Sequence, residues 1–131
     1  MKVTPKAQIS SGPAPADYFI GTVMMEQLHK ATEPSRAQSV RVTFQPGART
    51  NWHTHPLGQM LFVIEGEGWA QTEGEVKNTI RPGDVVWIPP GERHWHGATD
   101  GSAMVHIAVQ EADNGATADW AEPVSDADYL G

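Results

Sequence analysis

Short apolar stretches that alternate with polar residues dominate the middle of the chain. In residues 39–45, "SVRVTFQ", the apolar Val40, Val42 and Phe44 alternate with polar residues, which is the pattern of a strand with one buried face. Residues 21–31 fit a strand with a turn as well as a helical turn. Four further runs have β character: residues 59–66, 68–73, 84–89 and 103–110. Short strands spaced in this way predict an all-β sandwich or barrel.

Prolines and glycines separate these runs. The chain has 10 prolines and 13 glycines, so few segments between them are long enough for an average helix. At 131 residues it is large enough for one domain with a single core and too small for two. We therefore predict a single domain over residues 1–131 with a polar N-terminal arm at about residues 1–20.

Charge and cysteine content exclude several classes of partner. With 9 Lys and Arg against 16 Asp and Glu, the net charge of -7 disfavours nucleic acid and anionic membranes, which both attract positive surfaces. Because the chain has no cysteine, a metal would have to be held by imidazole, amide or carboxylate groups. No apolar run approaches the ~20 residues that span a bilayer, and the N-terminus lacks the apolar segment of a signal peptide. These features predict a soluble, cytoplasmic protein that binds neither nucleic acid nor a membrane.

The C-terminal segment, residues 111–131, carries six acids and no base. A disordered tail would explain this composition. The segment also contains apolar side chains at Trp120, Val124, Tyr129 and Leu130, which are suited to anchor it. We therefore expect it to dock along the domain.

Five of the six histidines are concentrated in the predicted β region. Two of them form a His-x-His pair in "WHTHPLGQM" and two more form a second pair in "RHWHGA". Side chains two apart on a strand point to the same face, so each pair directs two imidazoles toward one point. Such an arrangement suits a divalent first-row metal, whereas the sixth histidine, His29, is expected at the surface. The five are His53, His55, His94, His96 and His106.

Two stretches resemble the paired motifs of the cupin family. Residues 47–66 are similar to cupin motif one, G-x5-H-x-H-x3-E-x6-G, with Gln59 at the place of the glutamate. Residues 83–98 resemble motif two, G-x5-P-x-G-x2-H-x3-N, with Ala98 in place of the asparagine. The resemblance implies a small double-sheet jelly-roll barrel with a metal in its mouth.

A narrower resemblance extends over nearly the whole chain. The order "FxPGARTxWHTHPLGQ", "GWAQ", "PGDVVW", "PGExHWHGA" and "DWxExVxDxxY" is similar to the small bacterial cupin hydroxynitrile lyases. The resemblance implies manganese-dependent cleavage of cyanohydrins such as mandelonitrile. Zinc, nickel or iron would suit the same donors, and affinity order alone favours those metals over manganese. The implied ligands are His53, His55, Gln59 and His94, with His96 and His106 beside the open coordination positions.

The chemistry of a cyanohydrin suggests roles for these residues. The hydroxyl must lose a proton before cyanide leaves, and histidine is a suitable base because it titrates near neutrality. Strand parity places His106 and Gln110 on one face, so we predict His106 as the base and His96 or Gln110 as the group that steers or protonates cyanide. A neutral Gln59 would leave more positive charge on a metal than a glutamate would.

Apolar residues of the same strands are candidates for the substrate pocket. Val40, Val42 and Leu61 have the parity expected for the inner face, although plain core packing would explain them equally. Thr50 is a weaker polar candidate and Gln110 lies at the end of its strand. An aromatic substrate ring could also pack on a tryptophan, but core and subunit interfaces are the commoner places for one. The tryptophans considered are Trp52, Trp69, Trp87 and Trp95.

Two other functions are compatible with the sequence. One is a metal cupin with oxygen chemistry, a dioxygenase or an isomerase that acts on an oxygen-rich small molecule. The other is a cupin that binds a small molecule without catalysis. In each case several strongly apolar strands in a chain this short lead us to expect one sheet face to be buried against a copy of the chain, and the resemblance implies a homodimer or homotetramer.

Overall fold

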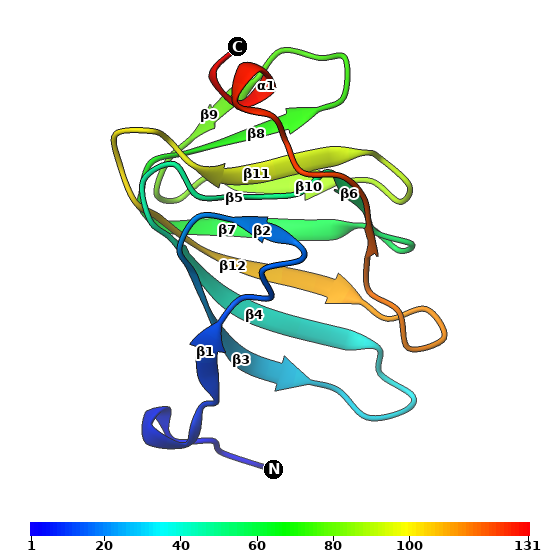
Figure 1. Cartoon of the computed structure of the whole chain (residues 1–131). Coiled ribbons are helices and arrows are strands. Elements are labelled where there is room, and N and C mark those ends of the chain that lie inside the picture. The colour runs from blue at the N-terminus through cyan, green and yellow to red at the C-terminus, as the bar shows by residue number, and fades with distance from the viewer.

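The chain folds into two antiparallel β-sheets that lie face to face (Figure 1). The computed structural model describes all residues from Met1 to Gly131. The first sheet contains, in spatial order, β1 (Ser11–Pro13), β3 (Val23–Lys30), β4 (Ala37–Phe44), β12 (Met104–Glu111), β7 (Gln59–Gly66) and β10 (Val85–Ile88). The second contains β13 (Asp119–Trp120), β6 (His53–Thr54), β11 (His94–Ala98), β5 (Arg49–Thr50) and β2 (Phe19–Ile20), and β8 (Gly68–Thr72) pairs with β11 and with β9 (Asn78–Ile80). The all-β prediction is confirmed.

The five strand runs predicted from the pattern all form strands. The run at 59–66 coincides with β7, and the runs at 39–45, 68–73, 84–89 and 103–110 overlap β4, β8, β10 and β12 with ends shifted by at most two residues. The ambiguous residues 21–31 form β3, whose pairing with β4 is irregular between Gln27 and His29. The only helices are a short 3-10 helix, η1 (Lys6–Gln8), and α1 (Asp126–Leu130), and no helix is long and apolar enough to cross a bilayer.

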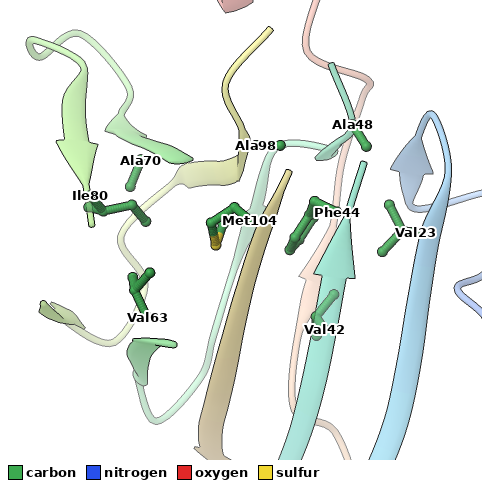
Figure 2. Packing of buried hydrophobic residues seen from close by; sticks show 9 residues of the cluster. All are labelled: Val23, Val42, Phe44, Ala48, Val63, Ala70, Ile80, Ala98 and Met104. Atoms are coloured by element: carbon green, nitrogen blue, oxygen red, sulfur yellow. The ribbon is translucent and has the colours of Figure 1, made fainter. Parts of the chain in front are cut away.

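The main hydrophobic core lies between the two sheets (Figure 2). Phe44, Val63 and Met104 come from neighbouring strands of the first sheet and have no solvent exposure. Ala70 and Ala98 contribute the facing side chains of the second sheet. Full burial of a side chain such as Val63 contributes about 1.5–3 kcal/mol, so this cluster is a main source of the stability that holds the sheets together.

A second apolar cluster lies under the C-terminal segment. Trp52 and Trp95 pack against Val124 and Tyr129. The Tyr129 hydroxyl donates to the Ala98 carbonyl at 2.7 Å. The acidic C-terminal segment is therefore docked, as predicted, although one expected anchor, Leu130, stays exposed.

The close approach of β11 and β5 depends on a glycine. A Cβ atom at Gly97 would overlap the Ala48 carbonyl and the Arg49 backbone. Because Gly97 has no side chain, β11 can pair directly with β5, and the His96 backbone N–H donates to Thr50 Oγ1 at 3.2 Å. This pairing holds β11, and with it His94 and His96, in place.

Candidate metal centre

Three histidines from two adjacent strands direct ring nitrogens toward one point. His53 begins β6, and His94 and His96 lie on β11 beside it, with His94 opposite His53. One nitrogen from each ring lies within 4.8 Å of the others, and all three residues are buried. Strand parity explains the geometry, since His94 and His96 are two residues apart and share a face.

The other two histidines of the predicted set lie beside this group. The His55 ring centroid is 4.9 Å from that of His53 and 5.4 Å from that of His94. His106 comes from β12 of the opposite sheet, and its Nε2 lies 3.1 Å from Nδ1 of His96. The fold therefore brings together five histidines from separate parts of the sequence.

Hydrogen bonds orient three of the five rings in the same way. Nδ1 of His53 lies 2.9 Å from the Asn51 carbonyl, and Nδ1 of His94 lies 2.9 Å from the carbonyl of Glu92. Nδ1 of His55 lies 2.7 Å from the carbonyl of Thr117. A carbonyl oxygen only accepts, so each Nδ1 carries the proton and each Nε2 retains a lone pair for a metal.

Several buried polar atoms have no partner within the protein. They include Nε2 of His55, Nε2 of His94 and Oε1 of Gln59. Gln59 Nε2 donates to Gln110 Oε1 at 3.0 Å, which leaves Gln59 Oε1 as a free acceptor. Because buried polar atoms are normally paired, a set of imidazole and amide lone pairs in one place is what a divalent cation would satisfy. The residues present thus fit a metal.

Burial keeps all five imidazoles uncharged near neutral pH. Desolvation is the largest cause in every case and lowers the pKa of His94 and of His106 from 6.5 to about 4. The pKa values of His53, His55 and His96 are also lowered, and neighbouring imidazoles add to the effect at His53 and His96. Neutral rings are ready to bind a metal, but the pKa of His106 lies well below the near-neutral value expected from the sequence, because that ring is completely buried.

A cavity of about 220 Å³ lies between the two sheets and is lined by four of the five histidines: His53, His55, His96 and His106. No acid, lysine or arginine lines it. Its volume lies below the about 300–1,000 Å³ of sites for drug-sized ligands, so it suits a small substrate. A second hollow, of about 400 Å³, touches His94 between β8 and β10 but contacts none of the other four histidines. The smaller cavity is therefore the candidate substrate site.

Most of the predicted pocket residues line this cavity. Val40, Val42, Thr50 and Gln110 all do so. Leu61 does not line it and packs instead in an apolar cluster with Ile88 and Ala108.

The four tryptophans considered from the sequence lie away from this cavity. Trp52, Trp69 and Trp95 pack in or against the cluster below the C-terminal segment, whereas Trp87 is 60% exposed. The sequence reasoning missed several lining residues that come from the two ends of the chain and from β3. These are Phe19, Met25, Thr117, Ala118 and Trp120.

Known proteins share this arrangement of sheets and motifs. The model of the family described as "Cupin domain" matches residues 40–109. The chain belongs to the cupin family. An (R)-mandelonitrile lyase from Granulicella tundricola is 54% identical over 120 residues, which are 92% of this chain and 92% of the relative.

Solved structures agree with the cupin assignment. A cupin-like protein from Thermotoga maritima superposes with a TM-score of 0.85 at 37% identity over 89% of each chain. A predicted oxalate decarboxylase from the same organism has a TM-score of 0.71 at 24% identity, over 82% of this chain and 96% of that one, which shows the shared fold alone.

This cupin departs from the family motifs at two positions near its histidines. Gln59 stands where motif one has a glutamate, so the only side chain at that place is a neutral amide held by Gln110. Ala98 stands where motif two has an asparagine, and it is fully buried in the core. Because Gln59 replaces a glutamate, no negative side chain lines the cavity beside the histidines.

Proposed function

We propose that this cupin is a metal-dependent hydroxynitrile lyase that cleaves cyanohydrins such as mandelonitrile to an aldehyde and hydrogen cyanide. The observation that carries the proposal is the 54% identity, over 92% of both chains, to an (R)-mandelonitrile lyase. The small uncharged cavity next to five neutral histidines supports the assignment, and the relative's name favours the (R) enantiomer as substrate.

The proposed metal ligands are His53, His55 and His94 through Nε2 and Gln59 through Oε1. The support is that backbone carbonyls occupy Nδ1 of all three rings and that Gln110 occupies the Gln59 amide nitrogen. His96 lies as near to His53 and His94 as a ligand would, and its Nε2 is also unpaired. We assign it to the reaction instead, because the resemblance implies a place beside the open coordination positions and because its Nδ1 contacts His106. Manganese is favoured by resemblance alone, and iron, zinc or nickel would fit the same donors.

A divalent metal in this centre would supply Lewis acidity for the negative charge that develops on the cyanohydrin oxygen. The protein itself must move a proton. A neutral His106 imidazole accepts the hydroxyl proton, the carbon–carbon bond breaks as the carbonyl forms, and cyanide leaves with the bonding electrons. The 3.1 Å contact between His106 and His96 lets the two rings share that proton, and His96 or Gln110 then steers cyanide while it is protonated.

The substrate side chain is assigned to the apolar part of the cavity. Val40 and Val42 project from β4 beside His106, with Thr50 on the opposite sheet and Gln110 at the end of β12. A small aromatic group excludes water there, which strengthens the electrostatic interactions at the reacting oxygen.

The test of the function measures mandelonitrile cleavage by the purified protein before and after removal of metal with a chelator. We expect activity in the loaded protein, loss on stripping, return with manganese, and no dependence on air. Full cleavage by metal-free protein would refute the metal role. Metal-dependent oxygen consumption without cyanide release would instead indicate an oxygenase.

We also propose that the chain forms a homodimer or homotetramer through the outer face of the first sheet. Phe62 of β7 is 40% exposed, and its register partner Val85 of β10 is 61% exposed. Trp87, on the same face of β10, is 60% exposed. Adjacent exposed apolar side chains of this kind mark contact surfaces. Sedimentation equilibrium should give a species larger than the 14.2 kDa monomer, and a monomer would contradict the proposal.

A further inference from the structure

The C-terminal segment supplies a hydrogen bond to one histidine of the centre. Nδ1 of His53 and of His94 bonds to the carbonyl two residues earlier in the same segment, at Asn51 and Glu92. The partner of His55 is the carbonyl of Thr117, which is 62 residues away in the sequence. The orientation of His55 therefore depends on where the C-terminal segment lies.

Trp120 contacts a second histidine of the centre. Its ring stacks on His53 with centroids 4.5 Å apart and planes at 24°. Tyr18 stacks on Trp120 at 4.8 Å and 13°. The His53 ring is thus backed by two aromatic rings, one from each end of the chain, which restrict its rotation about the Cβ bond.

Backbone pairing fixes these contacts in place. In β13, Asp119 pairs with Thr54 and Trp120 pairs with His53 of β6. Beyond β13, the Trp52 backbone N–H donates to the Glu122 carbonyl at 3.0 Å. The segment therefore runs directly alongside the strand that carries His53.

The far end of the segment is anchored away from the histidines. Arg49 Nη2 donates to the Val124 carbonyl at 2.7 Å and forms an ion pair with Asp126 at 2.9 Å. Tyr129 is buried, and the Arg49 guanidinium lies 4.3 Å from the centre of its ring. Docking of the segment thus has its own source of stability and does not require a metal.

We propose that residues 117–120 are a positioning element for the metal centre, in which the Thr117 carbonyl sets the orientation and tautomer of His55 and the Trp120 ring holds His53. The inference rests on the metal centre of the proposed function. Metal retention would then depend on the C-terminal segment, even though none of its side chains is a proposed ligand.

The Trp120 contact is tested by metal affinity in a chelator competition with manganese. Trp120→Ala should weaken affinity by about 10- to 100-fold, the range measured when groups that orient metal ligands are removed. Trp120→Phe should restore most of the affinity, because a phenyl ring can still stack on His53. The control is Leu130→Ala, which removes an exposed apolar side chain from the far end of the same C-terminal segment and should leave affinity unchanged.

The Thr117 contact is tested by inserting one glycine directly after Thr117. The insertion displaces the carbonyl while Asp119 and Trp120 can still pair with β6. The control places the same glycine after Asn114, in the exposed turn closed by the bridge between Asp113 and Ala116. Long-range nitrogen–proton NMR correlations of the metal-free proteins report which ring nitrogen carries the proton. The first insertion should remove the Nδ1–H form of His55 alone, and the control should keep it.

These readouts separate the inference from the proposed function. Unchanged manganese affinity in Trp120→Ala, or an unchanged His55 tautomer after the first insertion, would overturn the inference. A merely structural role would lower the melting temperature of the metal-free variants and leave affinity and tautomer as in the wild type. If the variants behave as expected but the wild type does not cleave mandelonitrile, the positioning role stands and the lyase proposal fails.

Discussion

Acid should destabilise the metal-free protein well above the pH at which carboxylates titrate. Burial lowers the pKa of His94 and His106 from 6.5 to about 4, so between these values the unfolded chain binds protons that the folded chain does not. The free energy of unfolding therefore falls as the pH drops from 7 toward 4. Below the folded-state pKa both states are protonated, and these two groups add no further loss.

The size of the effect follows from the two pKa values. For one such histidine, the free energy of unfolding falls by roughly 2 kcal/mol between pH 7 and pH 5, because the unfolded chain takes up a proton that the folded chain does not. His94 and His106 together thus account for about 4 kcal/mol. The pKa values of His53, His55 and His96 are lowered too, so the total should be at least this large. Such a loss is a large part of the about 5–15 kcal/mol that stabilises a typical domain.

Urea unfolding of the chelator-stripped protein at several pH values between 7 and 5 measures this loss. His106→Gln removes one buried imidazole and should reduce the loss by roughly 2 kcal/mol. His29→Gln removes an exposed imidazole outside the cluster and serves as the control, with a loss equal to that of the wild type. A free energy of unfolding that stays constant from pH 7 to pH 5 would refute the reasoning.

Two further predictions concern the proposed catalytic groups. Gln59→Glu should bind metal at least as tightly, because a carboxylate is the better ligand for a hard cation, and yet cleave mandelonitrile more slowly, because the added negative charge weakens the Lewis acid. Metal affinity and turnover measured on the same preparation decide this, and equal or faster turnover in a fully loaded site would contradict it. His106→Ala should lower turnover by about 100- to 10,000-fold with metal content unchanged, as expected for loss of a general base. If His106→Ala keeps wild-type turnover while His96→Ala loses it, the two roles are reversed.

Local pattern was sufficient for the strands and for the grouping of the histidines. Alternation of apolar and polar residues located β4 and β7, because a strand with one buried face must repeat every two residues. The same two-residue period brought His94 and His96 to one face of β11. Apolar residues in the acidic segment correctly indicated docking, since Val124 and Tyr129 would otherwise expose apolar surface to water.

Contacts between distant segments decided which residues line the cavity, the pKa of His106 and the partners of His55 and His53. Leu61 has the parity of an inner residue, but which inner residues face the cavity and which fill the core depends on how far the two sheets lie apart. The low pKa of His106 arises from complete burial, which depends on the whole barrel around it. The pairing of His55 with Thr117 and the stacking of Trp120 on His53 exist because β13 pairs with β6. The two-residue period of the sequence indicates which face of a strand a side chain occupies. How deeply that side chain is buried, and which distant residues it contacts, are decided only when the sheets and the chain ends pack together.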